Sequence, residues 1–100
     1  MLNIVNKSPF ERKNLENCLR TAPKGDTILL IEDAVYAAMQ NQKFADVMAQ
    51  AAKDYKVCVL GLDLTARGMD TGNVIDGISV VDYGGFVDLA TEQSAVQSWL

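Results

Sequence analysis

The sequence predicts a small α/β domain with a mainly parallel sheet of about four strands and helices on both faces. Short apolar runs at residues 2–5, 27–31, 57–60 and 78–81 alternate with segments of helical periodicity. The runs at residues 27–31 and 57–60 lack polar alternation, which is typical of strands that are covered on both faces. The length of 100 residues suits one domain, so residues 1–100 are expected to form a single unit.

The first helix has a clear local start signal. Ser8 is a good cap residue, Pro9 suits the first helical position, and Glu11 stands three residues after the cap. We therefore expect a helix that begins at Ser8 and ends before Pro23. The apolar stripe of this helix follows i, i+3, i+4, i+7 spacing and consists of Leu15, Cys18, Leu19 and Ala22.

The remaining helices follow the later strands. Helical patterns are expected at residues 34–39, 44–55 and 63–67, and a last helix is expected from Tyr83. A tail follows and ends in Trp99 and Leu100. The indole of Trp99 has too much apolar area to remain in water, so we expect it to anchor the tail by packing.

Composition limits the classes of function. The chain is 49% hydrophobic and 22% charged, which is ordinary for a globular protein. Its net charge is −4, and its scattered lysines and arginines predict neither nucleic-acid nor membrane binding. The first residues lack the order of a signal peptide, and no apolar run approaches the roughly twenty residues that a bilayer requires. We expect a cytoplasmic protein with free thiols.

The sequence lacks the residues that several kinds of catalytic and binding site require. The chain has no histidine, so a Ser-His or Cys-His pair cannot form within it. Two distant cysteines without histidine do not make a zinc site. The glycine motifs that bind dinucleotides and triphosphates are missing. A phosphoacceptor receiver domain would need acidic residues where Asn6, Lys7 and Gly61 stand. The sequence therefore predicts no cofactor and no metal.

Two short motifs have both a functional and a structural interpretation. Glu32 and Asp33 end the second strand and could act as an acid/base pair or as metal ligands. Capping of the following helix is the favoured interpretation, since carboxylates are stabilised at helix N-termini. Gly84 and Gly85 could approach a phosphate, but close helix–strand packing is the favoured explanation.

The two cysteines differ in their candidate roles. Cys18 lies on the apolar stripe of the first helix, so it is either a buried core residue or a persulfide site. Its place in the helix is too far from the N-terminus for the dipole to lower the thiol pKa much, so activation would have to come from nearby cations, with Lys13 or Arg20 as possible sources, or from a neighbouring subunit. Cys58 lies within a strand and is expected to be core.

Eight segments, in order and over the whole length, resemble the DsrH/TusB family. They are residues 6–12 (NKSPFER), 15–19 (LENCL), 31–33 (IED), 36–38 (YAA), 66–68 (ARG), 77–83 (GISVVDY), 85–89 (GFVDL) and 96–100 (VQSWL). The position of Cys18 and the NKSPFE start are more similar to the DsrH branch of sulfur oxidisers than to the TusB branch of tRNA thiolation. Ala34 stands where the family commonly has glycine.

The resemblance implies a DsrE-like, flavodoxin-like three-layer domain and a set of partners. It implies a cytoplasmic DsrEFH-type heterohexamer that relays persulfide sulfur to a DsrC/TusE-type carrier protein in dissimilatory sulfur oxidation. DsrE/TusD-like and DsrF/TusC-like subunits would complete the complex, and the main sulfur-carrying cysteine would lie on the DsrE/TusD-like partner. Cys18 would then be an auxiliary persulfide site, and no direct contact with nucleic acid is expected.

Three alternatives remain open from the sequence. The chain could be a TusB-type subunit of the sulfur relay for tRNA 2-thiouridine synthesis. It could also be a purely structural subunit in which Cys18 is buried and carries no sulfur. A lone small-molecule binder is less favoured, because the phosphate-binding loops are missing. Exposure of the Cys18 sulfur separates the relay from the structural interpretation.

Overall fold

A five-stranded parallel sheet forms the centre of the protein in the computed structural model, which describes residues 1–92 and 95–100. The strands are β1 (Leu2–Val5), β2 (Thr27–Leu30), β3 (Lys56–Leu60), β4 (Ser79–Val81) and β5 (Val96–Trp99). Their order across the sheet is β4-β3-β2-β1-β5, and every neighbouring pair is parallel. The predicted fold class is confirmed, with one strand more than the sequence analysis counted.

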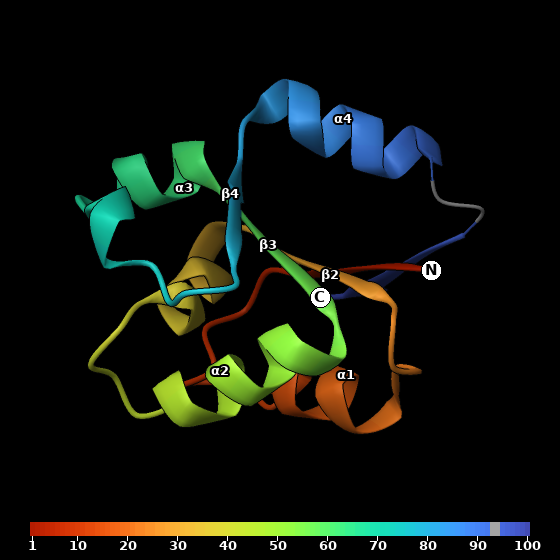
Figure 1. The fold of residues 1–100 in the computed structure, drawn as a ribbon, viewed down its shortest axis with the longest axis horizontal. Helices are drawn as coiled ribbons and strands as arrows, with labels where there is room; N and C mark the ends of the chain where they lie inside the picture. The colour runs from red at the N-terminus through yellow and green to blue at the C-terminus, as the bar shows by residue number, and fades with distance from the viewer. Residues whose placement is uncertain (93–94) are drawn as a thin grey trace.

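Helices cover the sheet unequally. Helices α1 (Asn14–Thr21) and α2 (Ala45–Asp54) lie on one face, and α4 (Tyr83–Glu92) lies on the other (Figure 1). The predicted short helix after β2 is the 3₁₀ helix η1 (Glu32–Ala38). The helical pattern predicted at residues 63–67 corresponds to α3 (Gly61–Ala66). A second 3₁₀ helix, η2 (Thr71–Asn73), follows it. The result is a three-layer arrangement.

The two faces of the sheet carry separate hydrophobic cores. On the face of α1 and α2, Ile28 and Leu30 of β2 join the larger cluster, which also contains Cys18. On the face of α4, Leu29 of β2 joins a smaller cluster with Cys58. The side chains of β2 thus contribute to both cores, because successive residues of a strand point to opposite faces.

The prediction that the first helix begins at Ser8 is wrong. Ser8 starts a separate turn, in which its hydroxyl accepts a hydrogen bond from the backbone N–H of Phe10, and the N–H of Arg12 bonds to its carbonyl. The turn places the ring of Phe10 against that of Phe44, with centroids 5.4 Å apart. Ser8 therefore stabilises this turn and does not cap a helix, and α1 begins six residues later, at Asn14.

The expected tail is a strand. Residues of β5 pair with β1 in register, Val5 beside Trp99. The indole Nε1 of Trp99 donates a hydrogen bond of 3.2 Å to Oδ1 of Asn3, and the ring packs against the larger core cluster. The prediction that Trp99 anchors the chain end is confirmed, and β5 is an edge strand of the sheet.

Gly85 allows α4 to approach the sheet. A Cβ atom at this position would lie 3.2 Å from Cβ of Val81 on β4, which is tighter than ordinary contact. At Gly84 the corresponding atom would make only an ordinary contact, 3.5 Å from Oδ1 of Asp82. The predicted close packing of helix and strand is therefore confirmed for Gly85 alone.

We expect Trp99→Ala to lower the free energy of unfolding by about 2–3 kcal/mol, because the packing of the ring is lost. The loss is smaller than for a fully buried ring, since Trp99 is only half-buried. Trp99→Phe should cost about 1 kcal/mol, since it keeps a ring and loses the hydrogen bond to Asn3. Leu100→Ala, at a residue that is 68% exposed, is the control and should change little. Urea unfolding measures all three, and an unchanged Trp99→Ala variant would contradict the anchoring role.

Candidate functional site

The thiol of Cys18 is enclosed in the larger core. The residue is on the inner side of α1 and is 0% exposed. Burial raises the pKa of the thiol from 9.0 to about 12, and the negative charge of Asp26 adds to this effect. A thiol with such a pKa is protonated at neutral pH, whereas the thiolate is the nucleophile in persulfide exchange.

The cations that could activate Cys18 do not do so. Arg20 directs its guanidinium at Oδ1 of Asn17, 2.6 Å away, and Lys13 is exposed at the start of α1. The charge that acts on the Cys18 thiol is the carboxylate of Asp26, which raises its pKa. The closed position favours the structural interpretation of Cys18, while its role as an auxiliary persulfide site stays a prediction.

Cys58 lies in the other core. It is 1% exposed on β3 and packs with the residues that α4 covers, as the sequence predicted. Burial raises the pKa of this thiol as well, and the nearby positive charge of Lys56 partly opposes the shift. Because the two cysteines belong to cores on opposite faces of the sheet, they are not a thiol pair.

Polar residues meet where β1, β2 and β3 end. The amide of Asn6 donates a hydrogen bond of 2.8 Å to Oε2 of Glu32, and the backbone N–H of Glu32 donates one of 2.7 Å to Oδ2 of Asp63. Asp33 forms an ion pair with Arg67, whose guanidinium donates a hydrogen bond of 2.9 Å to Oδ1 of Asp33. Glu32 has a φ of +50°, a left-handed conformation that costs free energy outside glycine.

This arrangement corrects the capping prediction for Glu32 and Asp33. Neither side chain caps η1, which has no side-chain cap. The free N–H of Glu32 is satisfied instead by Asp63, which comes from α3. Because Glu32 and Asp33 bind different partners, they do not form an acid/base pair. Within residues 1–92 and 95–100, no group of three or more metal-ligating side chains comes together.

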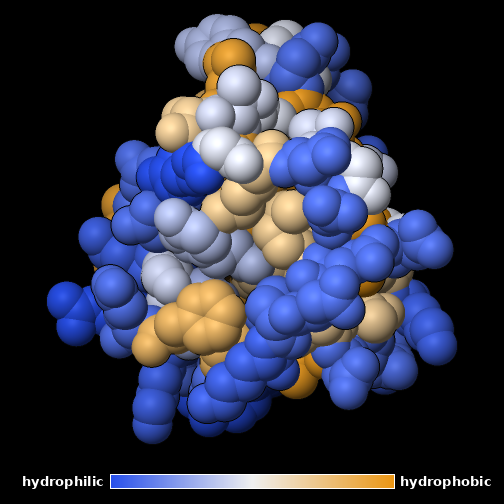
Figure 2. Space-filling model, turned by 90° about the vertical axis from the view of Figure 1, so that its left-hand side faces the viewer, coloured by the Kyte–Doolittle hydropathy of each residue, from blue (hydrophilic) through white to orange (hydrophobic). Residues whose placement is uncertain are grey.

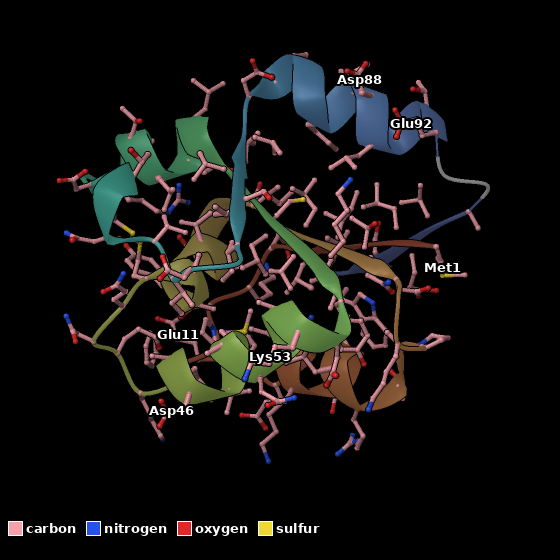
Figure 3. The ribbon with its side chains drawn as sticks, viewed as in Figure 1. Met1, Glu11, Asp46, Lys53, Asp88 and Glu92 are labelled. Atoms are coloured by element: carbon pink, nitrogen blue, oxygen red, sulfur yellow. The ribbon has the colours of Figure 1, made fainter. Side chains whose placement is uncertain are left out.

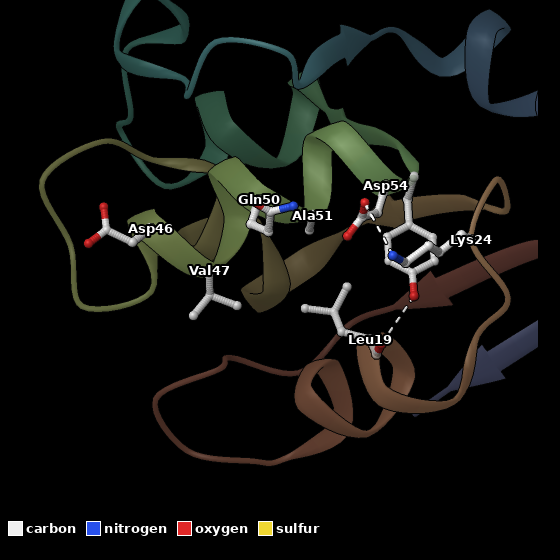
Figure 4. A pocket seen from close by; sticks show the side chains of 8 residues that line it. Leu19, Lys24, Asp46, Val47, Gln50, Ala51 and Asp54 are labelled. Atoms are coloured by element: carbon white, nitrogen blue, oxygen red, sulfur yellow. Dashed lines mark hydrogen bonds and ion pairs between the residues drawn. The ribbon is translucent and has the colours of Figure 1, made fainter.

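An apolar depression lies between α1 and α2 (Figure 4). It has a volume of about 490 Å³, and Leu19, Val47 and Ala51 supply much of its lining. At one end Lys24 and Asp54 form an ion pair of 3.8 Å. No cysteine is among the residues that line the depression.

Tyr55 closes the same region and was not singled out by sequence reasoning. Its hydroxyl lies 2.8 Å from the carbonyl of Ala22 and 3.1 Å from that of Leu19, which are at the end of α1. Carbonyls at a helix C-terminus need such partners. Burial raises the pKa of Tyr55, so its hydroxyl remains a donor. Its contacts span more than thirty residues of chain, and no local signal could have shown them.

The chemistry of these regions defines a class of protein. The described part of the chain is an α/β domain with two buried neutral thiols and no assembled catalytic or metal-binding group. None of its described helices is both long and apolar enough to cross a membrane. These features define a small α/β domain whose two thiols lie in its cores.

Comparison with known proteins gives the family. The model of the family described as "DsrH like protein" matches residues 7–96. Protein TusB of Enterobacter sp. (strain 638) is 36% identical over 99 residues, which cover 99% of this chain and 100% of that protein. Protein TusB of Shigella flexneri is 33% identical over the same coverage. The chain therefore belongs to the DsrH/TusB family.

Solved structures agree with the fold. The crystal structure of the ychN protein from E. coli matches with a TM-score of 0.80 over 97% of both chains, at 21% identity. A protein of unknown function from Methanobacterium thermoautotrophicum matches with a TM-score of 0.71 at 17% identity, over 97% of this chain and 95% of its own. At these identities the likeness concerns the fold.

The pKa of Cys18 predicts a loss of stability at high pH. Below pH 9.0 the folded and unfolded chains both hold the thiol proton. Above it the unfolded chain loses the proton and the folded chain keeps it, up to a pH of about 12. The free energy of unfolding should therefore fall by at most about 1.4 kcal/mol per pH unit in this window.

Urea unfolding between about pH 7 and about pH 11 measures this dependence. The control is Cys18→Ala, which has no thiol to titrate at this position and should lose less stability as the pH rises. If the free energy of unfolding depends on pH equally in the wild type and the variant, the Cys18 thiol is not held neutral by burial.

Proposed function

We propose that this chain is a TusB-type subunit of a cytoplasmic sulfur-relay complex that serves tRNA 2-thiouridine synthesis. The observation that carries the proposal is the relationship over the full length to proteins named TusB, at 33–36% identity. The TusB branch replaces the sulfur-oxidiser branch as the main interpretation, because these named relatives belong to it. The whole chain, residues 1–100, would act as one such domain.

The proposed partners follow from this assignment. The subunit joins DsrE/TusD-like and DsrF/TusC-like subunits in a heterohexamer, and the complex passes persulfide sulfur to a DsrC/TusE-like carrier protein. The reacting thiol lies on the DsrE/TusD-like partner. The burial of Cys18 and Cys58 supports this division, since neither thiol of this chain is open to a donor or acceptor.

Dissimilatory sulfur oxidation is the second candidate function. The family model that matches residues 7–96 is described as DsrH like, and the resemblance stated from the sequence implies that Cys18 matches a cysteine of the DsrH branch. If Cys18 acts as an auxiliary persulfide site in this function, its thiol must become accessible in the assembled complex. The relatives named TusB favour the tRNA role.

Deletion of the gene in the organism that encodes this chain tests the proposal. The 2-thiouridine content of its tRNA, measured by mass spectrometry of nucleosides, should fall strongly, and a plasmid copy of the wild-type chain should restore it. A Cys18→Ala copy should restore it equally, because the thiol is buried and carries no sulfur in this account. Unchanged 2-thiouridine after deletion would contradict the tRNA role and leave sulfur oxidation as the function to test.

A further inference from the structure

Charge is divided unevenly along the chain. Residues 68–100 carry five acidic residues and no lysine or arginine, which gives this segment a net charge of −5. Residues 1–67 carry nine basic and eight acidic residues, a net charge of +1. The acidic segment forms η2, β4, α4 and β5, which include both edge strands and the helix on the second face of the sheet.

Exposed apolar side chains lie on the same elements. Tyr83 and Val87, one helical turn apart on α4, are 63% and 42% exposed. Val80 of the edge strand β4 is 43% exposed, and Leu62 of the adjacent α3 is 61% exposed. Figure 2 shows apolar side chains reaching the surface at the top of the molecule, where α3 and the start of α4 lie.

A shared depression and adjacency in the sequence place these side chains near one another. Leu62 and Val80 line a shallow depression of about 380 Å³ together with Asp82. Asp82 directly precedes Tyr83 and caps α4 by accepting a hydrogen bond of 2.7 Å from the N–H of Gly85. We call Leu62, Val80, Tyr83 and Val87, with the carboxylates Asp82 and Asp88, the α4–β4 surface.

The cations of the chain do not neutralise this surface. In the described residues the ion pairs join Asp26, Asp33, Asp54 and Asp63, which are outside it. Arg67 is engaged by Asp33 and Asp63. Lys56 is at the amino end of β3, the opposite end of the strand from Leu62. Asp88 lies on α4, across the molecule from Asp46 and Lys53 on α2 (Figure 3).

We propose that the α4–β4 surface binds a partner protein whose contact face has an apolar centre and a rim of lysine and arginine. Such a partner would bury the exposed apolar side chains in a dry contact, and its rim of cations would pair with the carboxylates around them. A second copy of this chain would bring like charges together across the interface, and nucleic acid or anionic lipid would be repelled. The inference rests on the proposed function, since it names the surface that meets a partner subunit.

The chain offers a matched pair of sites for the test. Val87 and Asp88 are adjacent on α4, and Asp46 and Val47 are adjacent on α2, with the two valines 42% and 48% exposed. Val87→Ser and Asp88→Lys change the proposed surface, and Val47→Ser and Asp46→Lys make the same changes on the other face. Circular dichroism confirms that each variant is folded.

The probe is the pair of DsrE/TusD-like and DsrF/TusC-like subunits from the same genome, titrated with each full-length variant by calorimetry. Asp88→Lys and Val87→Ser should each weaken binding roughly tenfold, and the α2 variants should bind like the wild type. Raising NaCl from about 50 mM to about 500 mM should weaken the wild type, because salt screens the charges.

The outcomes separate this inference from the proposed function. Wild-type binding that the α4 variants do not weaken, or that salt does not weaken, overturns the inference and leaves the function standing. A wild-type chain that binds neither subunit overturns the proposed function and the inference with it. Self-association of the wild type that Val87→Ser abolishes assigns the surface to a second copy, which also overturns the inference.

Discussion

The burial of β2 on both faces is the constraint on which the rest of the structure depends. This strand is the middle one of five, and its four residues are at most 5% exposed. It can be dry on both sides only if helices cover both faces of the sheet, which α1 and α2 do on one side and α4 on the other. Helix α1 must therefore turn its apolar stripe inward, and Cys18 goes with it.

This packing decides what the chain can do chemically. A thiol in the core is kept neutral, and both cysteines of this chain are in that position. The polar side chains at the strand ends hold one another and the strained backbone of Glu32, so they serve the fold. Exposed apolar side chains lie on several elements, and those of α4 and β4 stand beside carboxylates that join none of the ion pairs of the described residues.

Local patterns predicted most of this fold, and the misses share a cause. The four apolar strands and the buried stripe of α1 were readable because their signals lie within a few residues. The cap signal at Ser8 is real but is used by a turn. Strand β5 is short, on an edge, and ordered by contacts of Trp99 with residues near the other end of the chain. The bond between Asp63 and Glu32 also joins distant segments. The sequence left two interpretations of Cys18 open, a buried core residue and a persulfide site. The exposure of its thiol depends on how α1 packs against the sheet, which local patterns do not show.

The central claim is that this chain contributes surface and its partner contributes the reacting thiol. The most direct test treats the assembled complex with a persulfide donor and measures added sulfur on each subunit by mass spectrometry of cysteine-containing peptides. The account predicts added sulfur on the DsrE/TusD-like subunit and none on the peptide that contains Cys18. Added sulfur on Cys18, absent from a Cys18→Ser complex that still assembles, would contradict it.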